Sequence, residues 1–266
     1  MTNIGVISDI HAEFLNVVDE PLKSIVEQKF YDIDYSGLDV LCISGDVDYQ
    51  TRGIDFINKY ILSNYPSLKV VYVCGNHEYW RGSLESTVDK LKLETENNSN
   101  IYFLHNSYAD IEGIRFIGST LWTDYNKKND LAMCEAKDSI NDFRKVRALN
   151  GTCKLLPIHL YNEHLISKKY IFDTIEQSSL PTIVVTHHKP YIGKGCVRDL
   201  LGYAYCSDLT YELEELSKKP LYWFSGHDHR HSELEMLGIQ FISNPLGYYT
   251  EYTHVDFDMN CCKVTI

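Results

Sequence analysis

The chain has 266 residues, of which 44% are hydrophobic and 23% charged, as in soluble globular proteins. Its formal net charge of −12 makes bulk nucleic-acid binding unfavourable, because that binding depends on lysines and arginines that neutralise phosphates. We expect no membrane span and no signal peptide, since no apolar run has spanning length and the first ten residues, MTNIGVISDI, lack a basic start and a cleavage site.

The eight cysteines contain no C-x-x-C pair, so the sequence predicts no structural zinc site. Several of them lie in apolar stretches of strand character, where a reduced cysteine behaves as a small hydrophobic residue. We therefore expect a reducing, cytoplasmic location.

The first part of the chain alternates short apolar runs with segments of helical spacing. Strands are predicted at 4–7, 38–43 and 70–73, and helices at 15–30, 54–61 and 84–93. This order predicts parallel strands joined by helical crossovers.

The second part of the chain has shorter elements. Strands are predicted at 101–104, 108–111, 114–121, 181–185, 221–224, 238–243, 252–258 and 264–266, and helices at 158–177 and 209–217. The strands at 108–111 and 114–121 are predicted to form a hairpin. The segments 122–157 and 189–208 are interpreted as insertions near the site. One domain, 1–266, is the simplest organisation.

Side chains that bind metals or move protons follow several of the predicted strands. Asp9 and His11 come after the first strand, and in an extended stretch residues two apart point to the same side, so both can reach one point. Asp46 follows Gly45 after the second strand, and Gly75 precedes Asn76 and His77 after the third.

Eight such residues occur along the chain, and each comes after an apolar run. They are Asp9, His11, Asp46, Asn76, His77, His187, His227 and His229. Buried polar groups cost free energy unless they are paired or bound, and metal ligation would compensate. Carboxylate, imidazole and amide ligands together favour a transition metal over calcium or magnesium.

In this order, the motifs resemble those of the calcineurin-like metallophosphoesterases of bacterial and phage type. The family pattern D-x-H, G-D, G-N-H-E/D, H and G-H-x-H occurs as Asp9-Ile10-His11, Gly45-Asp46, Gly75-Asn76-His77-Glu78, His187 and Gly226-His227-Asp228-His229. The resemblance implies an α/β fold, a four-layer αββα sandwich with two mixed β-sheets flanked by helices.

The resemblance also implies a dinuclear metal centre and a role for each motif residue. Asp9, His11 and His229 would hold one metal, Asn76, His187 and His227 the other, and Asp46 would bridge them. Two divalent transition-metal ions are implied, with Mn favoured and Fe, Zn, Ni or Co as alternatives. A hydroxide shared by the metals would attack phosphorus, and His77 would be catalytic at the leaving oxygen.

Several neighbours of the motifs have open roles. Asp48 and Arg52 are assigned no site role. Glu78 either orients His77 or caps the next helix, and His188 either supports the neighbouring ligand or packs. Arg144 and Arg147 either bind phosphate or are solvated, and Leu246 stands where relatives often carry arginine. The remaining histidines are interpreted as having no role in the site; they are His105, His159, His164, His231 and His254.

Several aromatic residues lie near the proposed site loops. They either stack a nucleobase or, as we slightly favour, pack the loops; they are Tyr79, Trp80, Trp122, Tyr191, Tyr203 and Tyr205.

The favoured function is phosphodiester hydrolysis on a nucleotide-type or other small phosphorylated substrate. A phosphomonoesterase or protein phosphatase and a nuclease of the same fold are the enzymatic alternatives. A catalytically silent relative that binds a phosphorylated ligand is the alternative from another class. The presence of His77 argues against it, since binding alone needs no proton donor. The oligomeric state is left open.

Overall fold

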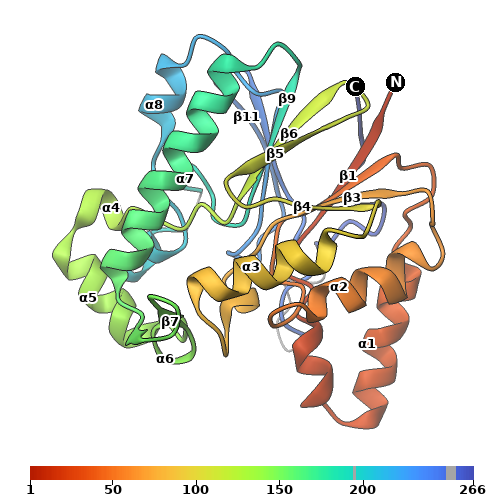
Figure 1. Ribbon diagram of the computed structural model, residues 1–266, viewed down its shortest axis with the longest axis horizontal. Helices are drawn as coiled ribbons and strands as arrows, with labels where there is room; N and C mark the ends of the chain where they lie inside the picture. Colours follow the sequence, from red (N-terminus) through yellow and green to blue (C-terminus); the bar gives the residue numbers. More distant parts are fainter. Residues whose placement is uncertain (194–195, 250–255) are drawn as a thin grey trace.

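Two mixed β-sheets pack face to face in the computed structural model, which describes residues 1–193, 196–249 and 256–266 (Figure 1). The first sheet has the order β13-β1-β2-β3-β4. Its strands are β1 (Asn3–Ile7), β2 (Val40–Ile43), β3 (Lys69–Tyr72), β4 (Ile101–Phe103) and β13 (Val264–Thr265). The second has the order β11-β12-β10-β9-β6-β5. Its strands are β5 (Ser107–Ile111), β6 (Ile114–Ser119), β9 (Thr182–Thr186), β10 (Tyr222–Ser225), β11 (Ser232–Met236) and β12 (Ile239–Ser243).

Alternating side chains of the strands build the layers. In β2, Val40 and Cys42 face the core between the sheets, whereas Leu41 and Ile43 face the outer helices. Strand residues point alternately to the two faces, so a run that is apolar at every position becomes a strand buried on both sides. The parallel register places Ile43 opposite Ile7 and Tyr72. The loops after these three strands therefore leave the sheet at the same edge.

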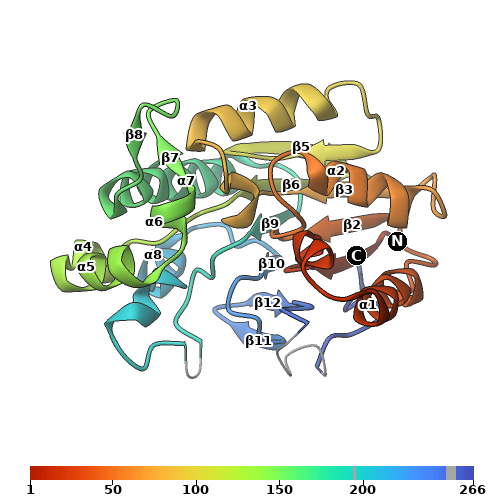
Figure 2. The same cartoon turned by 90° about the horizontal axis from the view of Figure 1, so that it is seen from below.

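Helices cover the outer faces of both sheets (Figures 1 and 2). The first sheet is covered by α1 (Glu20–Asp32), α2 (Arg52–Phe56), its π-helical continuation η2 (Ile57–Leu62), and α3 (Leu84–Thr95). The second sheet is covered by α7 (Pro157–Gln177) and α8 (Thr210–Glu215). The predicted four-layer αββα arrangement is confirmed.

The predicted helix at 15–30 is wrong in its first part. The structure has a 3₁₀ helix, η1 (Ala12–Asn16), and α1 then begins at Glu20. The side chain of Asp19 accepts a hydrogen bond from the backbone N–H of Leu22 (3.2 Å), and Pro21 lies in the first turn. An N-cap followed by proline starts a helix here and so separates the two apolar groups that the sequence analysis joined.

The segment 122–157 contains short elements that the sequence analysis did not assign. They are α4 (Tyr125–Lys128), α5 (Asp130–Ser139), α6 (Asp142–Lys145) and the hairpin of β7 (Arg147–Ala148) and β8 (Cys153–Lys154). The loop 189–208 contains the 3₁₀ helix η4 (Leu200–Ala204), and β11 was also unassigned. Of the predicted strand 252–258, residues 252–255 lie outside the described residues, and 256–258 are not in a strand.

Candidate metal centre

The chemistry-bearing residues follow the carboxyl ends of β1, β2, β3, β9 and β10. Within each sheet these strands are parallel, so their loops leave that sheet at one edge. The two edges lie side by side, since His11 after β1 is 3.0 Å from His229 after β10. The extended geometry predicted for Asp9 and His11 is wrong, since both have left-handed backbone conformations. Asp46, His227 and His229 share this conformation, and the five φ values lie between 50° and 74°. This conformation costs non-glycine residues free energy, and it clusters at functional sites.

Close approach of the loops depends on glycine. A Cβ added at Gly75 would lie 2.0 Å from Asp46 Oδ1, and one at Gly226 would lie 2.5 Å from Asp9 Oδ2. Any larger residue would collide with the carboxylates, which explains the glycines at the start of G-N-H-E and G-H-D-H.

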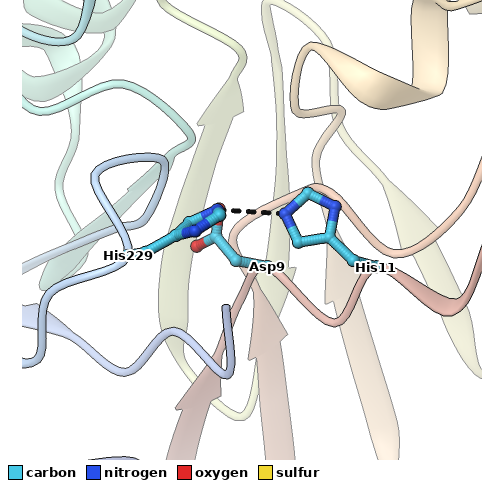
Figure 3. A group of neighbouring side chains, drawn as sticks. All are labelled: Asp9, His11 and His229. Carbon is cyan, nitrogen blue, oxygen red and sulfur yellow. Dashed lines mark hydrogen bonds and ion pairs between the residues drawn. The ribbon is translucent and has the colours of Figure 1, made fainter. Parts of the chain in front are cut away.

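The first group of donor atoms comprises Asp9, His11 and His229 (Figure 3). The Nε2 atoms of His11 and His229 face each other at 3.0 Å, and Asp9 Oδ1 lies 3.5 Å from His229 Nε2. The backbone N–H of His227 donates to both carboxylate oxygens of Asp9, at 3.0 and 3.1 Å. One carboxylate and two imidazole nitrogens therefore converge where a metal ion could be held.

The second group comprises Asn76, His187 and His227. The Nε2 atom of His187 lies 3.1 Å from Asn76 Oδ1 and 3.1 Å from His227 Nδ1. An amide oxygen and two imidazole nitrogens form a second donor set suited to a transition metal.

Asp46 lies between the two groups. Its Oδ2 atom is 3.7 Å from His11 Nε2 in the first group and 3.5 Å from His187 Nε2 in the second. Its Oδ1 atom accepts a hydrogen bond from the backbone N–H of His77 (2.8 Å). This bond fixes the carboxylate with Oδ2 toward both groups, so all seven predicted ligands are brought together around Asp46.

Buried partners orient the donor atoms. His187 Nδ1 donates to the carbonyl oxygen of Ser44 (2.7 Å), which leaves its Nε2 lone pair for the site. Asn76 Nδ2 donates to Asp142 Oδ1 (3.0 Å), which turns the amide oxygen inward. Such partners commonly fix the tautomer and orientation of metal ligands. The sequence analysis assigned Asp142 no role.

Burial favours the neutral form of two of the four candidate imidazole ligands, His11 and His227. It lowers the pKa of His11 to about 4, with the charge of His77 adding to the effect, and lowers the pKa of His227 well below its usual value. Burial also acts to lower the pKa of His187, but the carboxylates of Asp46 and Asp9 outweigh it and raise the pKa to about 10. Neutral imidazoles present the lone pair that a metal requires, and a bound cation would take the place of the proton on His187. The donor sets therefore fit metal ions.

Both roles proposed for Glu78 in the sequence analysis are wrong. Its carboxylate accepts backbone N–H groups from Asp46 (3.0 Å), Val47 (2.8 Å) and Gly75 (2.7 Å), and also the hydroxyl of Tyr72 (2.8 Å). It ties the loop after β2 to the loop after β3. Burial, with the charge of Asp46 adding to it, raises the pKa of Glu78 to about 8.

His77 begins the 3₁₀ helix η3 (His77–Tyr79). Its ring stacks on Trp80, with centroids 3.6 Å apart, and Lys145 Nζ lies 3.4 Å from the Trp80 ring centroid. His77 Nε2 lies 3.3 Å from the hydroxyl of Tyr248 and 3.9 Å from Asp46 Oδ2. The ring is thus fixed beside the candidate metal ligands.

A pocket of about 440 Å³ opens over the centre. Both predicted insertions contribute to its wall, through Ser139, Ile140, Asn141 and Asp142 from one and Cys196 and Tyr205 from the other. The remaining lining residues are Asp46, Asn76, His77, Trp80, His227, Asp228, His229, Arg230 and Tyr248. The sequence analysis assigned no role to Tyr248 or Arg230, although Arg230 directly follows His229 in the sequence.

The aromatic residues divide between packing and the pocket. Tyr79, Trp122 and Tyr191 are buried in the core, as the slightly favoured prediction held, and Tyr203 packs against it. Trp80 and Tyr205 line the pocket, and the ring of Tyr205 stacks on His227 with centroids 4.9 Å apart.

Arg144 and Arg147 are exposed and are not among the pocket's lining residues, and Arg144 donates to the carbonyl oxygen of Asp138. Leu246 is buried in the core. Asp48 forms an ion pair with Arg52 at 3.2 Å, outside the centre.

The other histidines have separate environments. His188 is buried, its Nδ1 lies 3.2 Å from the carbonyl oxygen of Thr120, and its ring packs directly on the candidate ligand His227. His164 is buried beside the carbonyl oxygen of Leu121 at 3.1 Å. His254 lies outside the described residues.

The fold and this centre define a metal-dependent phosphoester hydrolase. Residues 2–231 match the family model for calcineurin-like phosphoesterases, and the chain belongs to this family. The resemblance stated from the motifs is thereby confirmed.

The chain is also similar to three individual proteins. A protein of Acanthamoeba polyphaga mimivirus is 28% identical over 284 residues, with 95% of each chain covered. The phosphopantetheinyl hydrolase PptH of Mycobacterium tuberculosis has a TM-score of 0.67 at 16% identity, covering 95% of this chain and 94% of its own, and shows the same fold. A putative 5'-nucleotidase of Staphylococcus aureus has a TM-score of 0.48 at 15% identity and covers 91% of this chain and 48% of its own.

Within the described ranges, no helix is long and apolar enough to cross a membrane.

Proposed function

We propose that this chain hydrolyses a phosphodiester in a small, nucleotide-sized substrate at a two-metal centre. The observation that carries the proposal is the position of Asp46 Oδ2, 3.7 Å from His11 Nε2 and 3.5 Å from His187 Nε2. One carboxylate oxygen placed between two donor sets is the arrangement a bridging ligand requires. When bound, the two metal ions would activate water as the nucleophile and neutralise the phosphate oxygens.

The residues of the chain would have three tasks. Asp9, His11 and His229 would hold one ion, Asn76, His187 and His227 the other, and Asp46 would bind both. His77, fixed against Trp80, would donate a proton to the leaving oxygen or stabilise its charge. Manganese is the favoured metal because oxygen and imidazole donors are mixed and no thiolate belongs to either set.

The charges in the pocket favour a diester over a monoester. The described lining residues include one arginine, Arg230, and no lysine, but three aspartates, Asp46, Asp142 and Asp228. A diester carries one negative charge, whereas a monoester carries up to two and needs more cationic partners. The volume of about 440 Å³ suits a ligand of nucleotide size, and Trp80 and Tyr205 offer aromatic surface.

The test is a hydrolysis screen of the purified protein with Mn²⁺. The substrates are nucleotide diesters, nucleotide monoesters, single-stranded nucleic acid and a phosphopantetheine diester. The last is included because PptH of Mycobacterium tuberculosis, which has the same fold, is named a phosphopantetheinyl hydrolase. We expect the highest kcat/KM on a small diester, complete loss with EDTA and recovery with added Mn²⁺. Preference for a monoester or for the long polymer would replace the proposed substrate class. Hydrolysis that persists without metal would refute the proposal.

A further inference from the structure

Glu13 is a buried carboxylate that contacts two imidazoles of the site, those of the candidate ligand His11 and of the candidate catalytic residue His77. It lies in η1, directly after the D-x-H motif, and is 4% exposed. Its Oε1 atom is 2.5 Å from His77 Nδ1 and 3.0 Å from His11 Nδ1. The sequence analysis did not select it, because its contact with His77 spans 64 residues of chain.

These contacts determine which nitrogen of each ring carries the proton. A carboxylate accepts hydrogen bonds, so a neutral imidazole facing it must donate from Nδ1 and keep its lone pair on Nε2. For His11, that lone pair faces His229 and Asp46. For His77, Nε2 faces the pocket, 3.3 Å from the Tyr248 hydroxyl.

The position of Glu13 is unfavourable for stability alone. Its second oxygen, Oε2, is buried and has no hydrogen-bond partner among the described residues. A buried acceptor without a partner costs free energy, and in native proteins such groups need an explanation.

We propose that Glu13 is the shared positioning residue of this centre, holding His11 in the tautomer that ligates metal and His77 with Nε2 toward the substrate. This proposal rests on the proposed function for its catalytic consequence. A competing arrangement uses the same atoms, because His11, Glu13 and His77 have ligand atoms within 4.8 Å of one another and could together hold a cation.

The test compares Glu13→Gln with Glu20→Gln, the matched control at an exposed glutamate of the next helix. Both rings contact the same oxygen, Oε1, and a glutamine can place a neutral amide oxygen there, but it removes the negative charge that strengthens both hydrogen bonds. ¹⁵N-histidine spectra of the Zn²⁺-loaded full chain report the tautomer of each ring. Metal content and kcat are measured on an alkyl and a nitrophenyl phosphodiester.

We expect Glu13→Gln to change the ring spectra of His77 and His11. The value of kcat on the alkyl ester should fall about 10–100-fold at saturating metal, the usual effect of removing such a partner, with a smaller loss on the nitrophenyl ester. Adding Glu13→Gln to His77→Ala should cause little further loss of kcat at saturating metal. Glu13→Asp, which keeps the carboxylate, should restore the spectra in part and also serves if the glutamine variant does not fold.

Unchanged ring spectra and kcat within twofold of wild type in Glu13→Gln would overturn the proposal. Loss of one metal equivalent with the His77 spectrum unchanged would also overturn it, in favour of Glu13 as a ligand. If the ring spectra change in Glu13→Gln but the wild-type protein hydrolyses no phosphate ester, the proposed function is refuted and the positioning role of Glu13 stands.

Discussion

Replacing Asp46 with asparagine should abolish turnover almost completely and weaken binding of both metals. In the variant, the backbone N–H of His77 still requires an acceptor, which the asparagine oxygen can supply in place of Oδ1. The amide nitrogen would then take the place of Oδ2 and present N–H donors to His11 and His187. We expect kcat to fall by more than about 10³-fold, beyond the loss seen for one electrostatic contact.

The control for this variant is Asp48→Asn, two residues further along the same loop. Asp48 is also buried, but it pairs with Arg52 and faces neither group of ligands. Elemental analysis, kcat and thermal unfolding of both proteins give the comparison. Metal content and activity of Asp46→Asn equal to those of the control would show that the bridging role is wrong.

Replacing His77 with alanine should reduce kcat by about 10²–10⁴-fold on a nucleoside or alkyl ester while both metals remain bound. His77 lies 3.9 Å from Asp46 Oδ2 but belongs to neither of the two principal donor groups. A nitrophenolate leaving group needs no proton, so its hydrolysis should fall much less. The unequal loss is the signature of proton donation.

The measurement is kcat on the two esters together with metal content, with Tyr79→Phe as a control in the same 3₁₀ helix. An equal loss on the two esters would replace proton donation by charge stabilisation. Loss of a metal ion would make His77 a ligand and would remove the catalytic role proposed for it.

The fold was predictable where local pattern and tertiary environment agree. The run Val70 to Val73 is apolar at every position, because β3 is buried on both faces, and Gly75 ends it where the site begins. By contrast, β11 has the pattern Ser-Glu-Leu-Glu-Met and lies at a sheet edge, where its exposed glutamates give no sign of a buried strand.

The candidate ligands were predictable because each follows a strand within its own motif. Their partners were not, because the contacts depend on tertiary structure. Asp142 reaches Asn76 across 66 residues, and no local pattern distinguishes it from a solvated helix residue. Glu78 was noticed, but two of its three backbone donors, Asp46 and Val47, lie 32 and 31 residues away along the chain.

Anomalous diffraction from crystals of the Mn²⁺-loaded protein tests the two-metal centre most directly. The proposed arrangement predicts two manganese peaks on either side of Asp46, one among Asp9, His11 and His229, the other among Asn76, His187 and His227. A single peak, or a peak among His11, Glu13 and His77, would contradict it.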